Sequence, residues 1–232
     1  NHYLLESLFM LKYKTNFKKY LVQLEETIND PKFPVNDNIA SLSFLYLYNN
    51  KLNFHILEGS FAESEYLIPE VLYKMNQHSE HLDEHHEMLF YYKIACIYFG
   101  NEKYNESLFY LEKIINNKNL TMREDLMCFA RLLYLILHYE LGNDYYLENQ
   151  LKSTYKFMLK MNDLHEVQKE IIRFLKNLNS IYPGDIKKEF IKMKERFVEL
   201  EKNTYEKRAF LYLDIISWLE SKIENRKIGD II

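Results

Sequence analysis

Apolar positions recur every three or four residues along most of the chain, which is the spacing of one face of an α-helix. Short polar turns interrupt this pattern, and Pro31 and Pro34 mark the clearest loop. Pro69 lies inside one apolar stretch and is expected to kink that helix or delay its start. The pattern predicts an all-α protein with helices over residues 2–13, 17–29, 38–57, 62–77, 82–99, 103–117, 122–141, 145–161, 163–181, 185–203 and 205–225.

Four of the glycines repeat along the chain at a nearly constant interval. Gly59, Gly100, Gly142 and Gly184 are separated by 41, 42 and 42 residues. A period in this range is typical of solenoid proteins, in which each unit is one small structural motif. We expect each unit to be two antiparallel helices, with glycine, or Asn16 in the first unit, ending the first helix in the left-handed region. An aromatic residue after each turn is expected to wedge between the two helices: Phe17, Phe61, Tyr104 and Tyr145.

One unit carries a family resemblance. Its bulky, small and aromatic positions have the spacing of a tetratricopeptide repeat: Tyr91, Ile94, Ala95, Tyr98, Tyr104, Ser107, Leu111 and Ile114. The unit therefore resembles that repeat family, and the block 130–143 is similar to uncharacterised bacterial proteins of this class. The resemblance implies one domain over residues 1–232, a right-handed α–α superhelix of about five helical hairpins.

The expected domain has three parts. Residues 1–37 form an N-terminal helical pair and loop, residues 38–181 the repeats, and residues 182–232 long C-terminal capping helices. The apolar stripe of the first capping helix steps by four, three, four and three residues through Ile186, Phe190, Met193, Phe197 and Leu200. A second stripe follows at Tyr212, Ile216, Leu219 and Ile223, beside Trp218. Such stripes leave open a homodimer through the C-terminal helices.

Composition excludes several classes of protein. The chain has 5 glycines and 4 prolines in 232 residues, too few for the turns of an all-β fold or for a glycine-rich nucleotide loop. A net charge of −4 argues against nucleic acid as a partner. The chain also lacks the sequence motifs of hydrolases, zinc proteases and phosphate-binding loops, so we expect no enzymatic activity and no cofactor.

Cellular location is predicted from three features. Cys96 and Cys128 lie in apolar helical stretches, where thiols fit a reducing compartment better than a disulfide framework. The N-terminus does not have the pattern of a signal peptide, and the most apolar stretch, residues 126–141, is short for a membrane span. We therefore expect a cytoplasmic protein without membrane contact. Because residue 1 is Asn rather than Met, a fragment of a longer chain is also expected.

The resemblance implies a binding site on the concave face, where the first helix of each pair would contact a peptide or protein. The positions carried over, beside Cys96, are Asn49, Asn53, Tyr92, Phe99, Leu133, Leu137 and Glu140. Asparagine amides bind peptide backbones, and aromatic residues anchor side chains. The alternative interpretation is that the apolar members of this set belong to the core.

Two further features suggest other sites. His78, His81 and His85 would share one face of a continuous helix, where imidazoles bind zinc or nickel. The alternative is an exposed loop whose histidines only titrate, and this is the interpretation we favour. Residues 58–87 contain eight acidic residues and one lysine, a local charge of −7, which could attract a basic partner or simply face solvent.

The leading hypothesis is thus a non-catalytic scaffold that binds a protein or peptide on its concave face or its acidic edge. A second hypothesis is a ligand- or peptide-sensing domain of a larger regulator, similar to the bacterial pheromone-sensing regulators built on such repeats. A third and weaker one is metal binding through the histidines.

Overall fold

The computed structural model describes residues 2–34, 36–117, 124–161, 165–203, 206, 210 and 214–232. Within these ranges the chain is helical and contains no strand, which confirms the all-α prediction. The main helices are α1 (His2–Met10), α2 (Lys14–Asn29), α3 (Asp37–Glu58), α5 (Ile68–Gln77), α6 (Glu84–Gly100), α7 (Tyr104–Ile115), α8 (Glu124–Glu140), α9 (Asp144–Met161), α10 (Glu166–Asn177), α11 (Ile186–Glu201) and α13 (Ile215–Glu224).

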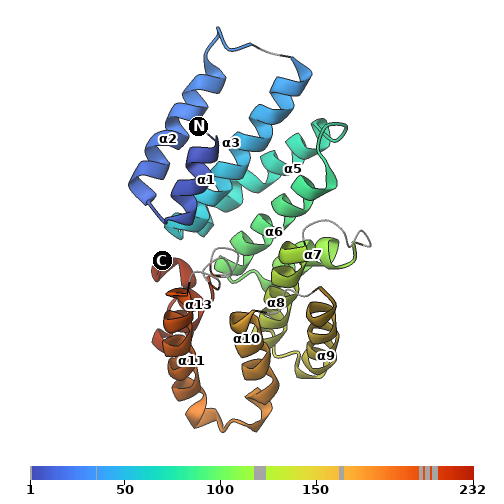
Figure 1. Ribbon diagram of the computed structural model, residues 1–232, viewed down its shortest axis with the longest axis vertical. Coiled ribbons are helices and arrows are strands. Elements are labelled where there is room, and N and C mark those ends of the chain that lie inside the picture. Colours follow the sequence, from blue (N-terminus) through green and yellow to red (C-terminus); the bar gives the residue numbers. More distant parts are fainter. Residues whose placement is uncertain are drawn as a thin grey trace.

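Helices that follow one another along the chain pack in pairs. Contacts join α1 to α2, α6 to α7, α8 to α9 and α11 to α13. A second set of contacts joins the first helices of successive pairs, from α1 to α3, α3 to α6, α6 to α8 and α8 to α10. Figure 1 shows the result: α1, α2, α3 and α5 lie at one end of the molecule, α9 to α13 at the other, and α6 to α8 between them.

The turns between paired helices repeat one backbone geometry. In four turns a residue with positive φ stands two positions before the next helix: Lys12 (φ 55°), Gly59 (72°), Glu102 (60°) and Gly142 (66°). In each turn the following amide donates to a carbonyl five residues back, as from Lys103 to Tyr98 at 2.9 Å and from the equivalent residues elsewhere. This hydrogen bond satisfies a carbonyl at the helix end, which explains why the turn recurs.

The glycine period therefore predicts only half of these turns. Gly59 and Gly142 occupy the left-handed position as expected. The expectation is wrong for Gly100, the last residue of α6, because Glu102 takes that conformation instead. It is also wrong for Asn16, which lies inside α2, since Lys12 forms the first turn.

Residues five positions after each left-handed residue are buried against the paired helix: Phe17, Ser64, Ser107 and Leu147. The Ser107 hydroxyl donates to the Ala95 carbonyl at 2.8 Å, so a small side chain lets α7 approach α6 closely. Of the predicted aromatic wedges, Phe17 and Phe61 are buried and Tyr104 is partly buried. Tyr145 is 85% exposed, and that prediction is wrong because Leu147 fills the equivalent space.

Several helix limits differ from the predicted ones. The helix expected at 62–77 is divided into α4 (Phe61–Ser64), the 3₁₀ turn η1 (Glu65–Leu67) and α5, with Pro69 in the first turn of α5, where its missing N–H costs little. The helix expected at 163–181 ends at Asn177 and continues as the 3₁₀ turn η2 (Leu178–Ser180). Most of the first half of the helix expected at 205–225, including Tyr212, lies outside the described residues.

The apolar stripe of α11 packs against other helices of the same chain. Phe190, Met193, Phe197 and Leu200 are buried, and α11 packs against α10 and α13. The 3₁₀ turn η3 (Pro183–Asp185) precedes α11. These four side chains of the stripe are therefore covered by the chain itself, although Ile191 and Val198 remain exposed on the same helix.

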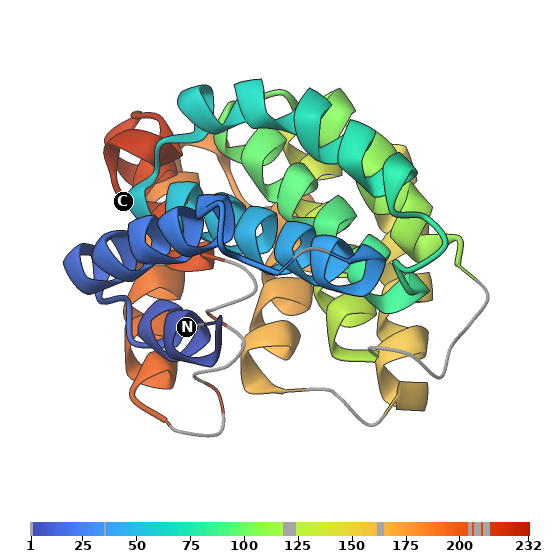
Figure 2. The ribbon, with the colours of Figure 1, turned by 90° about the horizontal axis from the view of Figure 1, so that it is seen from above.

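Both ends of the described chain lie on the same side of the molecule (Figure 2). The last turn, η4 (Ile228–Asp230), packs against the turn after α3, where a Cβ built on Gly229 would lie 2.5 Å from the Gly59 carbonyl oxygen. The Lys14 ammonium donates to the Ile232 main-chain carbonyl at 2.9 Å. Contacts between N- and C-terminal segments thus join the two ends of the helical array.

Candidate functional site

The predicted concave-face residues do not form an open surface. Six of them are buried: Asn49, Asn53, Tyr92, Phe99, Leu133 and Leu137. The side chain of the seventh, Glu140, is 7% exposed. The structure thus places the set in the interior, as the alternative interpretation described, and it corrects the expectation of an accessible peptide groove at these positions.

The C-terminal helix explains part of this burial. Trp218 of α13 is 1% exposed, and its indole Nε1 donates to Glu140 at 2.5 Å. The ammonium group of Lys222, one turn further along α13, pairs with the other Glu140 oxygen. Phe99 and Cys96 of α6 share a cavity with residues from α13 and η4. Cys96, Phe99 and Glu140 thus lie against the chain's own C-terminal segment.

The asparagines belong to a polar cluster, here called the asparagine cluster, which consists of the buried residues Asn49, Asn50, Asn53 and Lys93 and the partly buried His2. Lys93 of α6 donates to the main-chain carbonyl of Asn49 at 3.4 Å and also to its side-chain oxygen. Burial lowers the pKa of His2, which stacks on Tyr46 with ring centroids 4.0 Å apart. Cys96, nearby on α6, has its pKa raised by burial to about 12. The cluster places a lysine charge inside the core with amide groups as its partners.

Two amide oxygens of this cluster, Asn50 Oδ1 and Asn53 Oδ1, have no hydrogen-bond partner within the described structure. A buried polar group without a partner destabilises the fold. We expect Asn53→Leu, which removes one such oxygen and keeps the number and branching of the side-chain heavy atoms, to stabilise the protein by about 1 kcal/mol. Urea denaturation followed by circular dichroism measures the change.

Asn49 provides a matched control for this substitution, because it lies one turn earlier on α3 and is also buried. Its side chain accepts from Lys93, so Asn49→Leu is expected to destabilise the protein by about 1.5–3 kcal/mol, the range for a hydrogen bond to a charged group. Opposite signs for the two variants would support this account of the cluster. Destabilisation by both would show that Asn53 has a partner.

The three histidines of the metal hypothesis do not share a helical face. Helix α5 ends at Gln77 and α6 begins at Glu84, so His78 and His81 lie in the turn between them. His78 Nδ1 is 3.0 Å from Ser41 Oγ, and the ring of His85 packs on that of His86. In the part of the chain that the structure describes, no group of three or more His, Cys, Asp or Glu side chains could hold a metal ion.

Several acids of the segment 58–87 bond within the chain. Glu65 pairs with Lys103 at 2.5 Å, and Glu87 accepts from the Tyr91 hydroxyl at 2.6 Å, which with burial raises the pKa of that tyrosine. Asp83 caps α6 by accepting from the His86 amide at 2.8 Å. Of these three acids, Glu65 is paired with a lysine and joins two turns, whereas Asp83 and Glu87 bond at the start of and within α6.

An accessible apolar groove lies elsewhere, between α9 and α10, and is here called the α9–α10 groove. It encloses about 390 Å³ and is lined by Asp144, Leu147, Glu148, Leu151, Lys152, Tyr155, Ile172, Leu175 and Lys176. The four aliphatic residues are buried and form its floor, while Tyr155 is 43% exposed. Two acidic and two basic side chains surround this floor, and Lys152 pairs with Glu148 at 3.1 Å.

Sequence reasoning missed this groove although a signal is present. Leu147, Leu151, Tyr155 and Leu159 repeat every four residues along α9, which places them in one row on the helix surface. The row continues from the groove to Leu159, which is exposed. From the sequence alone such a row is interpreted as part of the core, because the position of the next helix is not known.

No family model, curated protein or solved structure matches the chain. Among the described helices, none is long and apolar enough to cross a membrane.

Proposed function

We propose that this protein is a non-catalytic binding module, a right-handed α–α superhelix of about five helical hairpins that takes one helix of a protein partner. The repeated turn geometry and the contacts between the first helices of successive pairs support the superhelix. The long C-terminal helices α11 and α13 cap it. Because the concave residues are buried, the proposed binding site moves from that face to the α9–α10 groove.

The observation that carries the proposal is the combination of a buried aliphatic floor with an exposed aromatic wall. Helices pack by placing side-chain ridges of one helix in the groove between the ridges of another. The row from Leu147 to Leu159 is such a ridge, and α10 supplies the opposite wall with Ile172 and Leu175. An amphipathic helix with aliphatic residues three and four apart fits this surface. Its charged flanks would face Glu148 and Lys152.

The proposal is tested by affinity capture from a lysate of the native host, with partners identified by mass spectrometry. We expect Tyr155→Glu to abolish capture of a partner that the wild-type protein retains, because a carboxylate on the groove wall is costly to desolvate. Tyr66→Glu is the matched control, since Tyr66 is 86% exposed and lies far from the groove in the sequence.

A partner lost only in the groove variant supports the module and identifies its pathway. Retention of every partner by Tyr155→Glu contradicts the groove as the binding site. Circular dichroism of both variants checks that the substitutions leave the helices intact.

A further inference from the structure

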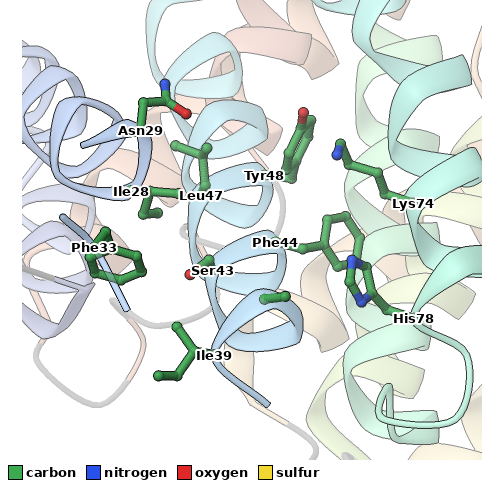
Figure 3. Close-up of a pocket in the computed structure, with 11 residues that line it drawn as sticks. Ile28, Asn29, Phe33, Ile39, Ser43, Phe44, Leu47, Tyr48, Lys74 and His78 are labelled. Carbon is green, nitrogen blue, oxygen red and sulfur yellow. The ribbon is translucent and has the colours of Figure 1, made fainter. Parts of the chain in front are cut away.

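A second cavity lies at the opposite end of the molecule, between α2, α3 and α5, and is here called the α3 cavity (Figure 3). It encloses about 290 Å³, close to the lower limit for small-molecule sites. Eleven residues line it: Ile28, Asn29, Phe33, Ile39, Ala40, Ser43, Phe44, Leu47, Tyr48, Lys74 and His78. Helix α3 provides the floor, the end of α2 one wall, and α5 with the turn after it the other (Figure 3).

Six of the eleven lining residues have hydrocarbon side chains. Leu47 of α3 lies on the side of Ile28 and Phe33, whereas Phe44 lies on the other side of the cavity, next to His78 (Figure 3). The Phe44 ring stacks on the His78 ring at 5.2 Å and on the Phe90 ring at 5.3 Å, and it is 4% exposed, so little of its surface is left for a ligand. A flat aromatic molecule would instead contact the aliphatic and aromatic side chains on the α2 side of the cavity.

One cationic group lies at the wall of this apolar space. The Lys74 ammonium is 5.5 Å from the centre of the Tyr48 ring, and Figure 3 shows it extended toward that ring. The acids nearby have other partners, because Glu25 pairs with Lys51 at 2.5 Å and Glu70 accepts from the Tyr48 hydroxyl. Among the described residues Lys74 forms no ion pair, and the lining contains no Asp or Glu. A ligand carboxylate would supply the missing partner.

The hydrogen bonds of His78 determine what its other ring nitrogen can do. The Ser41 hydroxyl donates its hydrogen to the Asp37 carbonyl at 2.9 Å. At its 3.0 Å contact with His78 Nδ1, Ser41 must therefore accept, so the proton lies on Nδ1. Burial, with Lys74 and His81 nearby, lowers the pKa of His78, which keeps the ring neutral at pH 7. Nε2 is consequently an acceptor, suited to an N–H or O–H donor.

We propose that the α3 cavity binds a small aromatic carboxylic acid that carries an N–H group. The aromatic body lies against Ile28, Phe33 and Leu47, the carboxylate pairs with Lys74, and the N–H donates to His78 Nε2. This site is independent of the α9–α10 groove, so failure of one leaves the other standing.

The first test uses indole-3-propionate as the probe, with isothermal titration calorimetry and saturation-transfer NMR on the whole chain. We expect the acid to bind at least about tenfold more tightly than its primary amide, because only the acid offers a charge to Lys74. Equal binding of the acid and the amide, or no binding of either, would overturn the proposal.

Lys74→Met removes the ammonium and keeps the aliphatic stem, and is expected to weaken binding of the acid about tenfold or more. Lys113→Met is a closely matched control. Lys113 lies 5.4 Å from the centre of the Tyr91 ring, and the Tyr91 hydroxyl donates to Glu87 as that of Tyr48 does to Glu70. Equal effects of the two variants would contradict a specific role for Lys74.

A third variant distinguishes hydrogen bonding from packing. His78→Phe preserves a ring on Phe44 but removes the acceptor, so it should weaken indole-3-propionate and leave 2-naphthalenepropionate, which has no N–H, nearly unchanged. Equal weakening of both probes would show that His78 contributes packing and no hydrogen bond.

A fourth variant, Ala40→Leu, narrows the cavity and leaves Lys74 and His78 intact. It should reduce binding of both acids, and unchanged binding would place the ligand elsewhere.

Discussion

Replacing Trp218 by alanine is expected to destabilise the protein by about 3–5 kcal/mol, the range for truncating a large buried aromatic residue. Trp218 makes T-shaped contacts with Phe190 at 5.7 Å and Tyr139 at 6.1 Å, and its indole donates to Glu140. The substitution therefore leaves a cavity and removes one hydrogen-bond donor from a buried carboxylate. Since this is the single tryptophan of the chain, urea denaturation must be followed by circular dichroism.

Two controls separate the contributions of this side chain. Trp218→Phe retains most of the buried area and loses the Nε1 donor, so it should destabilise by about 1.5–3 kcal/mol, the value of a hydrogen bond to a charged group. Loosening α13 should also expose the Cys96 thiol to alkylation, with Cys128, buried in α8, as the internal reference. A loss below about 1 kcal/mol for Trp218→Ala would contradict the packing of α13 described above.

Gly100→Ala is expected to destabilise the fold by about 2–3 kcal/mol, although alanine is the better helix former. A Cβ at this position would lie 2.3 Å from Cδ2 of the buried Phe61 ring, too close for either group to remain in place. The neighbouring Asn101 amide donates to the Phe61 carbonyl at 2.9 Å, which restricts how far that residue can move. Thermal and urea denaturation both report this loss.

The other glycines of the period provide a graded comparison. Gly142→Ala meets no atom within 4 Å but has φ 66°, so about 1 kcal/mol of backbone strain is expected. At Gly184 a Cβ meets no atom within 4 Å and φ is not positive. Gly184→Ala should therefore be neutral or stabilise the protein by about 0.4–1 kcal/mol, because alanine lowers the conformational entropy of the unfolded chain. Phe61→Leu combined with Gly100→Ala should recover part of the loss, since the two positions are in contact. Equal effects at all three glycines would show that the contact with Phe61 is unimportant.

The periodic glycines occur for different structural reasons, although they form one pattern in the sequence. The period of about 42 residues marks units of two helices, and the turns do repeat, as the left-handed residues show. Yet Gly100 is required by the close approach of Phe61, Gly59 is favoured by its positive φ and by the close approach of Gly229, Gly142 is favoured by its positive φ alone, and Gly184 has neither reason. The hydrogen bond that ends each helix is formed by the backbone, so Lys12 and Glu102 can take the same place. A repeat in the sequence therefore predicts where a turn lies, but it does not predict which residue of the turn adopts positive φ.

The candidate sites depended on information that the sequence does not contain. The resemblance to tetratricopeptide repeats assigned Asn49, Asn53, Tyr92 and Leu137 to one side of the first helices, but it did not reveal what lies against that side. The answer came from α13 and η4, segments far away in the sequence that pack on the inner side through Trp218 and Ile228. Likewise, Lys74 and His78 are separated by one turn along the chain, but they become walls of a cavity because α2 lies opposite them (Figure 3).

The sequence by itself determined the helices, most of their limits and the recurring turns, because these follow from local interactions: the spacing of apolar residues, the effect of Pro69 and the capping of helix ends. Only the tertiary structure decided which faces are covered, that the histidines do not meet, and where the α9–α10 groove and the α3 cavity lie. The physical reason is that an apolar row has the same appearance whether it packs against a neighbour or faces solvent. Contacts between distant segments make that choice.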